Sequence, residues 1–170
     1  MMSHPATPQG VEFVTAGWAG RIAADLKTAR ESAILTALSI LPPRPSQPSD
    51  LAAMIAEARA AAARGVAVIV VVPAPTKAHP ATGRNASTAR DLIADGVTVR
   101  LLNPANLLHA KTCTIDGRIA WVGSGNYTHA AATHNHEAWL RTTNPGAAYA
   151  IAKWQRALAD QSSRPTPEQL

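Results

Sequence analysis

The chain has 170 residues, 46% of them hydrophobic, a length and composition that suit one globular domain with a single core. Its formal net charge of +5 favours polyanionic partners, such as nucleic acid or an acidic membrane surface. The lone cysteine excludes an intrachain disulfide, and the absence of a signal-like N-terminus or an apolar run of about 18 residues leads us to expect a soluble, cytoplasmic protein.

The first half of the chain alternates strand and helix patterns. A proline cluster at 42–48 cannot continue any regular element, Ser49 or Asp50 can cap the helix that follows, and Gly65 can end it. The apolar run after Gly65 is typical of a central parallel strand. We expect a flexible arm at 1–10, a strand at 11–15, a helix at 21–29, a buried strand at 33–41, a helix at 51–64 and a strand at 66–72.

The second half adds further strands and ends on a helix. Tyr149 and Trp154 are expected on the packed side of that last helix. We expect a polar loop at 73–87, a helix at 88–94, a strand at 97–102, a hairpin around 116–117, a short helix or turn at 127–133, a strand at 136–143, a helix at 146–159 and a flexible tail at 161–170. This order predicts one α/β domain over 11–160, an α/β/α sandwich whose central mixed sheet is parallel in its first half and antiparallel in the hairpin.

The hairpin organises the polar residues of the chain. Asp-Gly at 116–117, between two apolar runs, is the strongest short-range signal for a two-residue type I′ turn. Counting back from that turn pairs Lys111 with Val122 and His109 with Ser124. Because residues two apart on a strand share a face, four polar side chains are predicted on one side of the hairpin: His109, Lys111, Ser124 and Asn126.

This cluster combines an imidazole, an ammonium, a hydroxyl and a carboxamide. The ammonium supplies a point charge with three donors, and the hydroxyl and amide add neutral donors. A neutral imidazole can act as a nucleophile or a base. The set is suited to holding a tetrahedral anion and attacking it, and a phosphodiester fits it best.

These residues also carry a resemblance to a known family. The pattern His109-x-Lys111-x₄-Asp116, followed by the run Gly-Ser-Gly-Asn at 123–126, resembles the signature of the phospholipase D superfamily. Glu137 stands where the single-motif nucleases of that superfamily carry a glutamate. The resemblance is strongest over 107–140 and extends more loosely in element order over 11–158.

The resemblance implies a role for each polar residue. His109 would attack phosphorus to form a phosphohistidine, which water then resolves. Lys111 and Asn126 would hold the non-bridging oxygens, and Ser124 would add a donor. Glu137 would lie near the second nitrogen of the imidazole and fix its tautomer, as the third member of a triad does.

The remaining motif residues have structural explanations as well. Gly123 and Gly125 would let the backbone approach the anion closely, and Gly125 stands where relatives often carry a bulkier residue. Asp116 belongs to the motif, but its place in the turn is explained by turn chemistry alone, which favours a structural role over a catalytic one.

Three histidines near Glu137 raise the question of a metal site. The spacing of His129, His134 and His136 matches no standard zinc pattern, and the resemblance implies chemistry that needs no metal or other cofactor. We therefore expect these histidines to be exposed to solvent or to face the substrate.

A single histidine motif implies a second copy of the chain. Relatives with one motif pair as homodimers, so we expect two His109 rings in one cleft, one as nucleophile and one as general acid. The expected activity is a metal-independent endonuclease acting on DNA or RNA, with Lys77 and Arg84 as candidate backbone contacts and Arg90 and Arg118 as further ones. A phospholipid hydrolase and a catalytically silent nucleic-acid-binding module are the alternatives, although no membrane-binding amphipathic stretch supports the first.

Overall fold

The computed structural model of the chain describes residues 10–42, 49–77, 80–103, 105 and 107–170, so most of the expected N-terminal arm lies outside the described residues. The strands are β1 (Val11–Val14), β2 (Ser32–Thr36), β3 (Ile40–Leu41), β4 (Ala67–Pro73), β5 (Thr98–Leu102), β6 (Lys111–Ile115), β7 (Ile119–Gly123), β8 (Tyr127–Thr128) and β9 (Trp139–Thr142). The helices are α1 (Trp18–Lys27), α2 (Asp50–Ala63), α3 (Asn85–Ala94), α4 (His129–Thr133) and α5 (Pro145–Asp160), with 3₁₀ turns at Pro80–Arg84 and Pro167–Gln169.

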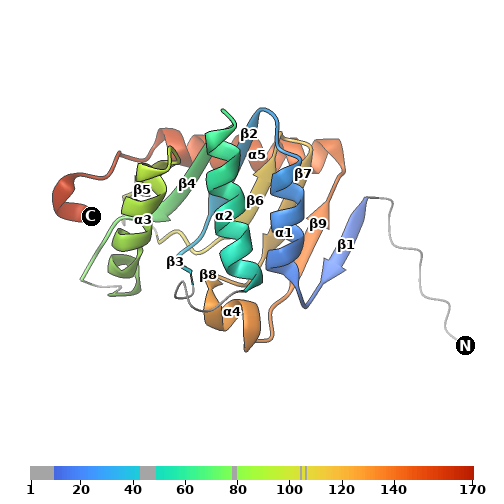
Figure 1. Cartoon of the computed structure of the whole chain (residues 1–170), viewed down its shortest axis with the longest axis horizontal. Helices are drawn as coiled ribbons and strands as arrows, with labels where there is room; N and C mark the ends of the chain where they lie inside the picture. The colour runs from blue at the N-terminus through green and yellow to red at the C-terminus, as the bar shows by residue number, and fades with distance from the viewer. Residues whose placement is uncertain (1–9, 43–48, 78–79, 104, 106) are drawn as a thin grey trace, which may run out of the picture.

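A seven-stranded mixed sheet forms the middle layer, in the order β1-β9-β7-β6-β2-β4-β5. Strands β2, β4 and β5 are parallel neighbours, and β6, β7, β9 and β1 extend the sheet in antiparallel pairs. Helices α1, α2 and α3 cover one face and α5 packs on the other (Figure 1). The predicted α/β/α sandwich with a mixed sheet is confirmed.

One edge of this sheet gathers the ends of several strands. Thr36, at the end of β2, is paired with Thr112 of β6 and with Val71 of β4. Because β6 runs against β2, Lys111 at its start lies at the edge where β2 and β4 end, the lower edge in Figure 1. We call it the carboxyl edge of the sheet.

The hairpin has the predicted turn but a different register. Asp116 and Gly117 both have positive φ, 52° and 64°, and the N–H of Arg118 donates to the carbonyl of Ile115. However, the ladder pairs Ile115 with Ile119, which makes Arg118 an extra residue between the turn and the ladder. The predicted register is therefore wrong by one residue.

That shift changes which residue faces Lys111. Gly123, and not Val122, is the partner of Lys111 in β6, and β7 ends there, before Ser124. His109 itself precedes β6 and is not part of a strand. The polar cluster consequently does not arise from a single regular face of the hairpin.

Several element boundaries also differ from the predictions: α1 begins at Trp18 and not at 21, and β9 begins at Trp139 and not at 136. The buried strand expected over 33–41 is two strands, because the chain turns after Thr36 and the backbone of Ser39 bonds to the segment that follows β7. Strand β3 then pairs with β8 in a separate two-stranded sheet. Helix α3 begins at Asn85, three residues before the predicted start.

The outer face of α5 is more apolar than expected. Tyr149 and Trp154, predicted on the packed side, are 60% and 42% exposed. The helix packs instead through small residues and one amide, Ala148, Ala152 and Gln155, which allow it to approach the sheet closely. No helix of the described residues is long and apolar enough to cross a lipid bilayer.

The segment after α5 lies against the sheet. The sequence predicts a flexible tail at 161–170, but Ser163 forms a β-bridge with Leu101 of β5. Farther along, the side chain of Arg90 bonds to the carbonyl of Leu170. These contacts hold both ends of the segment to the edge strand and to α3.

Candidate active site

His109 and Lys111 form the first pair of the site. The Nζ of Lys111 donates to the carbonyl oxygen of His109 at 2.6 Å and lies 3.0 Å from its Nδ1. The imidazole is exposed, whereas Lys111 is only 3% exposed. Since Lys111 begins β6, the ladder fixes its position, and its ammonium in turn fixes the segment that carries the imidazole.

The ammonium of Lys111 lies in a partly apolar environment. Burial lowers the pKa of Lys111 below its ordinary value, and the negative charge of Glu137 opposes that shift. Glu137 is therefore close enough to interact with Lys111 electrostatically. A positive charge that is poorly solvated is free to attract an anion strongly.

Ser124 and Glu137 form the second pair. The hydroxyl of Ser124 donates to one carboxylate oxygen of Glu137, and Asn135 Nδ2 donates to the other at 3.1 Å. The N–H of Ala138 donates to the Ser124 oxygen at 3.1 Å. Both carboxylate oxygens are thus held by donors from the connection between β7 and β9.

The predicted contact between Glu137 and the imidazole is not part of this arrangement. Within the described chain, no hydrogen bond joins Glu137 to His109, and the carboxylate accepts from Ser124 and Asn135 instead. The two pairs are related only through the effect of the Glu137 charge on Lys111.

Asn126 presents its amide in a defined orientation. Its Oδ1 accepts the backbone N–H of Ser39 at 3.3 Å, and the neighbouring N–H of Tyr127 donates to the carbonyl of Ser39 at 3.1 Å. In the described part of the chain, Nδ2 of Asn126 has no hydrogen-bond partner. The amide is left with two free donors for an anion.

An aromatic side chain fills the space beside both glycines of the motif. A Cβ at Gly123 would lie 2.2 Å from the ring of Trp139, and one at Gly125 would lie 3.2 Å from its Nε1. Trp139 stacks on Trp18 with ring centroids 4.8 Å apart, and its buried Nε1 has no hydrogen-bond partner among the residues that the structure describes. The glycines therefore accommodate this ring, whatever they contribute to anion binding.

Asp116 follows the other end of β6, about 16 Å from Lys111 along the strand. Its carboxylate accepts the backbone N–H groups of Arg30, Glu31 and Ser32. Burial alone would raise its pKa, but these donors, together with the charge of Arg118, hold the pKa below its ordinary value. The structure thus separates Asp116 from the other motif residues and joins it to the start of β2.

Comparison with known proteins identifies the family. The family model described as cardiolipin synthase, PLD-like domain, matches residues 22–158. The chain belongs to the phospholipase D superfamily. The superfamily predicted from the two motifs is thereby confirmed. No curated protein matches the sequence significantly.

Solved structures of phospholipase D family members and other proteins share the fold. Nuc from Salmonella typhimurium, a phospholipase D family member, has a TM-score of 0.73 at 20% identity, over 91% of this chain and 97% of that one. Phosphatidylserine synthase from Haemophilus influenzae Rd KW20 has a TM-score of 0.65 at 15% identity, over 91% and 39%. TrmBL2, an archaeal chromatin protein, has a TM-score of 0.61 at 10% identity, over 95% and 56%.

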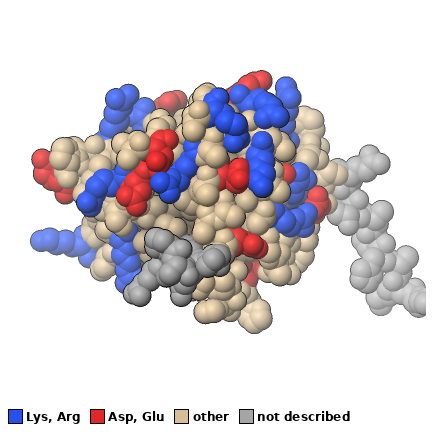
Figure 2. Space-filling view, viewed as in Figure 1, with Lys and Arg blue, Asp and Glu red and all other residues tan. Residues whose placement is uncertain are grey.

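The candidate phosphate contacts outside the phospholipase D motifs are less well defined. Lys77 and Arg84 are exposed on the segment that follows β4, which leaves the sheet at the carboxyl edge. Figure 2 shows that Lys and Arg side chains on the face covered by α1, α2 and α3 are interspersed with Asp and Glu and do not form one basic patch. This face therefore offers no strong electrostatic footprint for nucleic acid.

The histidines at the two ends of α4, His129 and His134, form a ring contact with each other. The rings of His129 and His134 meet edge to face, with centroids 5.6 Å apart, and no described residue forms a hydrogen bond with the buried Nδ1 of His129. His136 is exposed just before Glu137. Among the described residues, no three His, Cys, Asp or Glu side chains are grouped to hold a metal ion.

The two motifs do not predict several residues that shape this phospholipase D-like site. Asn135 holds Glu137, Trp139 fills the space at the glycines, and Ser39 orients Asn126. Asn135 lies two residues before Glu137 and Trp139 two after it, so proximity to the motif is a usable signal for both. Ser39 lies 87 residues from its partner within an apolar run, and nothing in the local sequence indicates the contact.

Proposed function

We propose that the protein is a metal-independent phosphodiesterase of the phospholipase D type, acting as an endonuclease on DNA or RNA. The observation that carries the proposal is an exposed imidazole, at His109, held against a buried ammonium, at Lys111. An accessible nucleophile beside a desolvated positive charge is suited to attack on an anionic ester. The net charge of +5 and the DNA binding of TrmBL2, which has this fold, favour nucleic acid as the substrate.

In the proposed reaction, a ring nitrogen of His109 attacks phosphorus and the bond to the leaving ester oxygen breaks. That oxygen takes a proton from a general acid, and a phosphohistidine remains. Water then gives its proton to the same group, now a base, and attacks phosphorus, so that the P–N bond breaks and His109 is regenerated.

The surrounding donors stabilise the charge that develops. The Lys111 ammonium and the free Nδ2 donors of Asn126 would hold the non-bridging oxygens. Ser124 is engaged with Glu137, and Glu137 lies within electrostatic reach of Lys111. We propose that this carboxylate keeps Lys111 protonated, a role different from the contact with imidazole that the resemblance implies.

A second copy of the chain would supply the general acid. Cross-strand pairing places Phe13, Leu140, Val122 and Thr112 in one row on the sheet face opposite α1 and α2, and the first three side chains are exposed. A hollow beside this row is lined by Ala110, Thr112, Val122, Ala150, Ile151 and Trp154.

We propose that this apolar face joins the two protomers. Ala110 lines the hollow and adjoins His109 at the carboxyl edge of the sheet, so a two-fold contact that reaches this edge would bring both imidazoles toward the axis. The exposed ring of Trp154, which lines the hollow, and the exposed apolar row beside it give a surface that can fit a second copy of itself. An apolar row of this kind is unfavourable in an isolated chain.

Cleavage assays test the proposed activity. Wild type and His109→Ala are incubated in EDTA with single-stranded DNA, double-stranded DNA, RNA and phospholipid vesicles. We expect wild type alone to cleave nucleic acid, because the imidazole is the nucleophile and no metal is required. Equal cleavage by both proteins, or activity that needs an added metal ion, would overturn the proposal.

The same assay separates two alternatives. The matching family model is described as cardiolipin synthase, and phosphatidylserine synthase shares the fold, which favours a phospholipid substrate as the second candidate. Release of headgroup from vesicles without cleavage of nucleic acid would support it. Binding of DNA by both proteins without any cleavage would support a catalytically silent module.

A further inference from the structure

The orientation of Asn126 depends on a short segment of backbone between β2 and β3. Ser39 in this segment donates to Oδ1 of Asn126 and accepts from the N–H of Tyr127. The next two residues, Ile40 and Leu41, form β3 and pair with β8, which directly follows Asn126. The orientation of the Asn126 side chain therefore depends on the position of the backbone at residues 38–41.

This segment cannot be rigid through its own pairing. The sheet formed by β3 and β8 has two strands of two residues each, well below the size at which a pair of strands is stable alone. Another part of the chain has to hold it.

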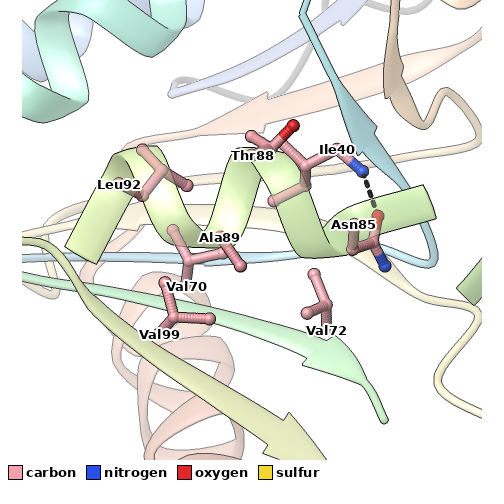
Figure 3. A pocket seen from close by; sticks show the side chains of 8 residues that line it. All are labelled: Ile40, Val70, Val72, Asn85, Thr88, Ala89, Leu92 and Val99. Atoms are coloured by element: carbon pink, nitrogen blue, oxygen red, sulfur yellow. Dashed lines mark hydrogen bonds between the residues drawn. The ribbon is translucent and has the colours of Figure 1, made fainter. Parts of the chain in front are cut away.

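Asn85, the first residue of α3, provides that hold. Its Oδ1 accepts the N–H of Ile40 at 2.9 Å and its Nδ2 donates to the carbonyl of Leu38 at 3.0 Å, so one amide holds the backbone on both sides of Ser39. Asn85 is only 4% exposed. Figure 3 shows its side chain directed at Ile40 from the end of α3, beside a small apolar cavity that Leu92 and Val99 also line.

We propose that Asn85 is a positioning residue for the proposed phosphodiesterase reaction, acting on Asn126 through the backbone of residues 38–40. Both polar ends of its amide are bonded to this segment, in the orientation that leaves Ser39 free to bond Asn126. The free Nδ2 of Asn126 is then aimed at the substrate without contact between the two asparagines. The inference rests on the proposed function for its effect on rate.

A double-mutant cycle separates positioning from a purely structural role. Asn85→Ala removes both hydrogen bonds, and Leu92→Ala, two turns along the same helix and beside the same cavity, is the matched control that keeps them. The probe is bis(p-nitrophenyl) phosphate, at a temperature where circular dichroism shows every variant folded.

We expect Asn85→Ala to lower kcat about tenfold with little change in KM, because the donor that stabilises the transition state is misplaced. In the Asn126→Ala background it should change kcat less than about twofold, since the group that it positions is gone. Leu92→Ala should change kcat less than about twofold in both backgrounds. An equal loss from Asn85→Ala in both backgrounds would overturn the proposal.

Amide hydrogen exchange tests the linkage without activity. We expect Asn85→Ala to speed exchange at the N–H groups of Ser39 and Tyr127 by at least about tenfold more than Leu92→Ala does, because both hydrogen bonds join Ser39 to residues 126–127 and depend on the position of the held segment. Equal acceleration in the two variants would overturn the proposal. If wild type hydrolyses no phosphodiester, the proposed function fails, and exchange still decides whether Asn85 holds Asn126.

Discussion

The indole of Trp139 fills the space that a side chain at Gly123 would need. Gly123 is paired with Lys111 in β6 on one side and with Trp139 in β9 on the other. Because directly paired residues share a face, the absence of a side chain at the middle position lets the indole lie across β7 and stack on Trp18. Tyr127 packs beside the stack at 6.2 Å from both rings, and together they form a rigid base next to the site.

This packing makes Gly123→Ala strongly destabilising. The new methyl group would overlap the ring of Trp139, which is 1% exposed and held by Trp18, so neither side chain has room to move. We expect a loss of about 3 kcal/mol in the free energy of unfolding, measured with chemical denaturant.

The double variant Gly123→Ala with Trp139→Leu tests the cause. The smaller leucine leaves room for the methyl group, so the double variant should be more stable than the sum of the single losses predicts. Additive losses would show that the glycine is needed for its backbone and not for the ring.

Replacement of Lys111 should affect the catalytic rate much more than the stability. Lys111→Met removes a buried ammonium and its hydrogen bond to the His109 carbonyl, so we expect a modest loss of about 1 kcal/mol in the free energy of unfolding. In contrast, kcat should fall by about 10² or more if the ammonium holds phosphate oxygens. Steady-state kinetics and denaturant unfolding measure the two effects. A variant that keeps its rate would contradict the proposed role.

The pH dependence of the rate follows from the same residue. Burial lowers the pKa of Lys111, so the ammonium loses its proton at a lower pH than an exposed lysine does. The rate should therefore fall on the alkaline side as that proton is lost. In Lys111→Arg this fall should move to higher pH, because a guanidinium stays charged. A pH profile with the same alkaline limb in both proteins would assign the fall to another group.

The sequence predicts those parts of the fold and site that depend on local chemistry. Alternating patterns and turn signals are sufficient for the layers and the mixed sheet, and motif spacing is sufficient to place His109 close to Lys111. What it misses depends on tertiary contacts. The extra residue Arg118 shifts the hairpin register, and Asn85 falls within a predicted loop because the start of α3 carries no capping signal.

A substitution at Asp116 can distinguish a catalytic role from a structural one. Asp116→Asn keeps a residue that tolerates the positive φ of 52°, but it replaces an anion that accepts three backbone N–H groups. We expect a loss of about 1–3 kcal/mol in the free energy of unfolding at neutral pH and a change in kcat of less than about twofold. A loss of rate without a loss of stability would instead assign Asp116 to the reaction.

The acid side of the stability curve checks the same carboxylate. Its pKa is lowered in the folded state, so the unfolded chain binds the proton at a higher pH. The ionised carboxylate stabilises the folded state fully above the ordinary pKa of aspartate, about 4. This stabilisation is lost as the pH falls through the lower pKa of the folded state. Unfolding midpoints measured from pH 5 to 2 should therefore decline less steeply in Asp116→Asn than in wild type.

The apolar face beside α5 leads to a prediction about assembly. Leu140 lies in the exposed row between Phe13 and Val122 and is itself 49% exposed. If this face joins two protomers, Leu140→Asp would bury a charge in the interface and should yield a monomer in light scattering. Its cleavage rate should fall by about 10² or more, because each site then lacks the second histidine as general acid.

Ile93→Asp is the matched control, since Ile93 is 40% exposed and lies on α3, which covers the opposite face of the sheet. This variant makes the same change in charge at a similar degree of exposure, but away from the proposed interface. The mass in light scattering and the cleavage rate should therefore equal those of wild type. A Leu140→Asp monomer that cleaves at the wild-type rate would mean that one imidazole per site is sufficient, with some other group protonating the leaving oxygen. A Leu140→Asp dimer would place the interface elsewhere.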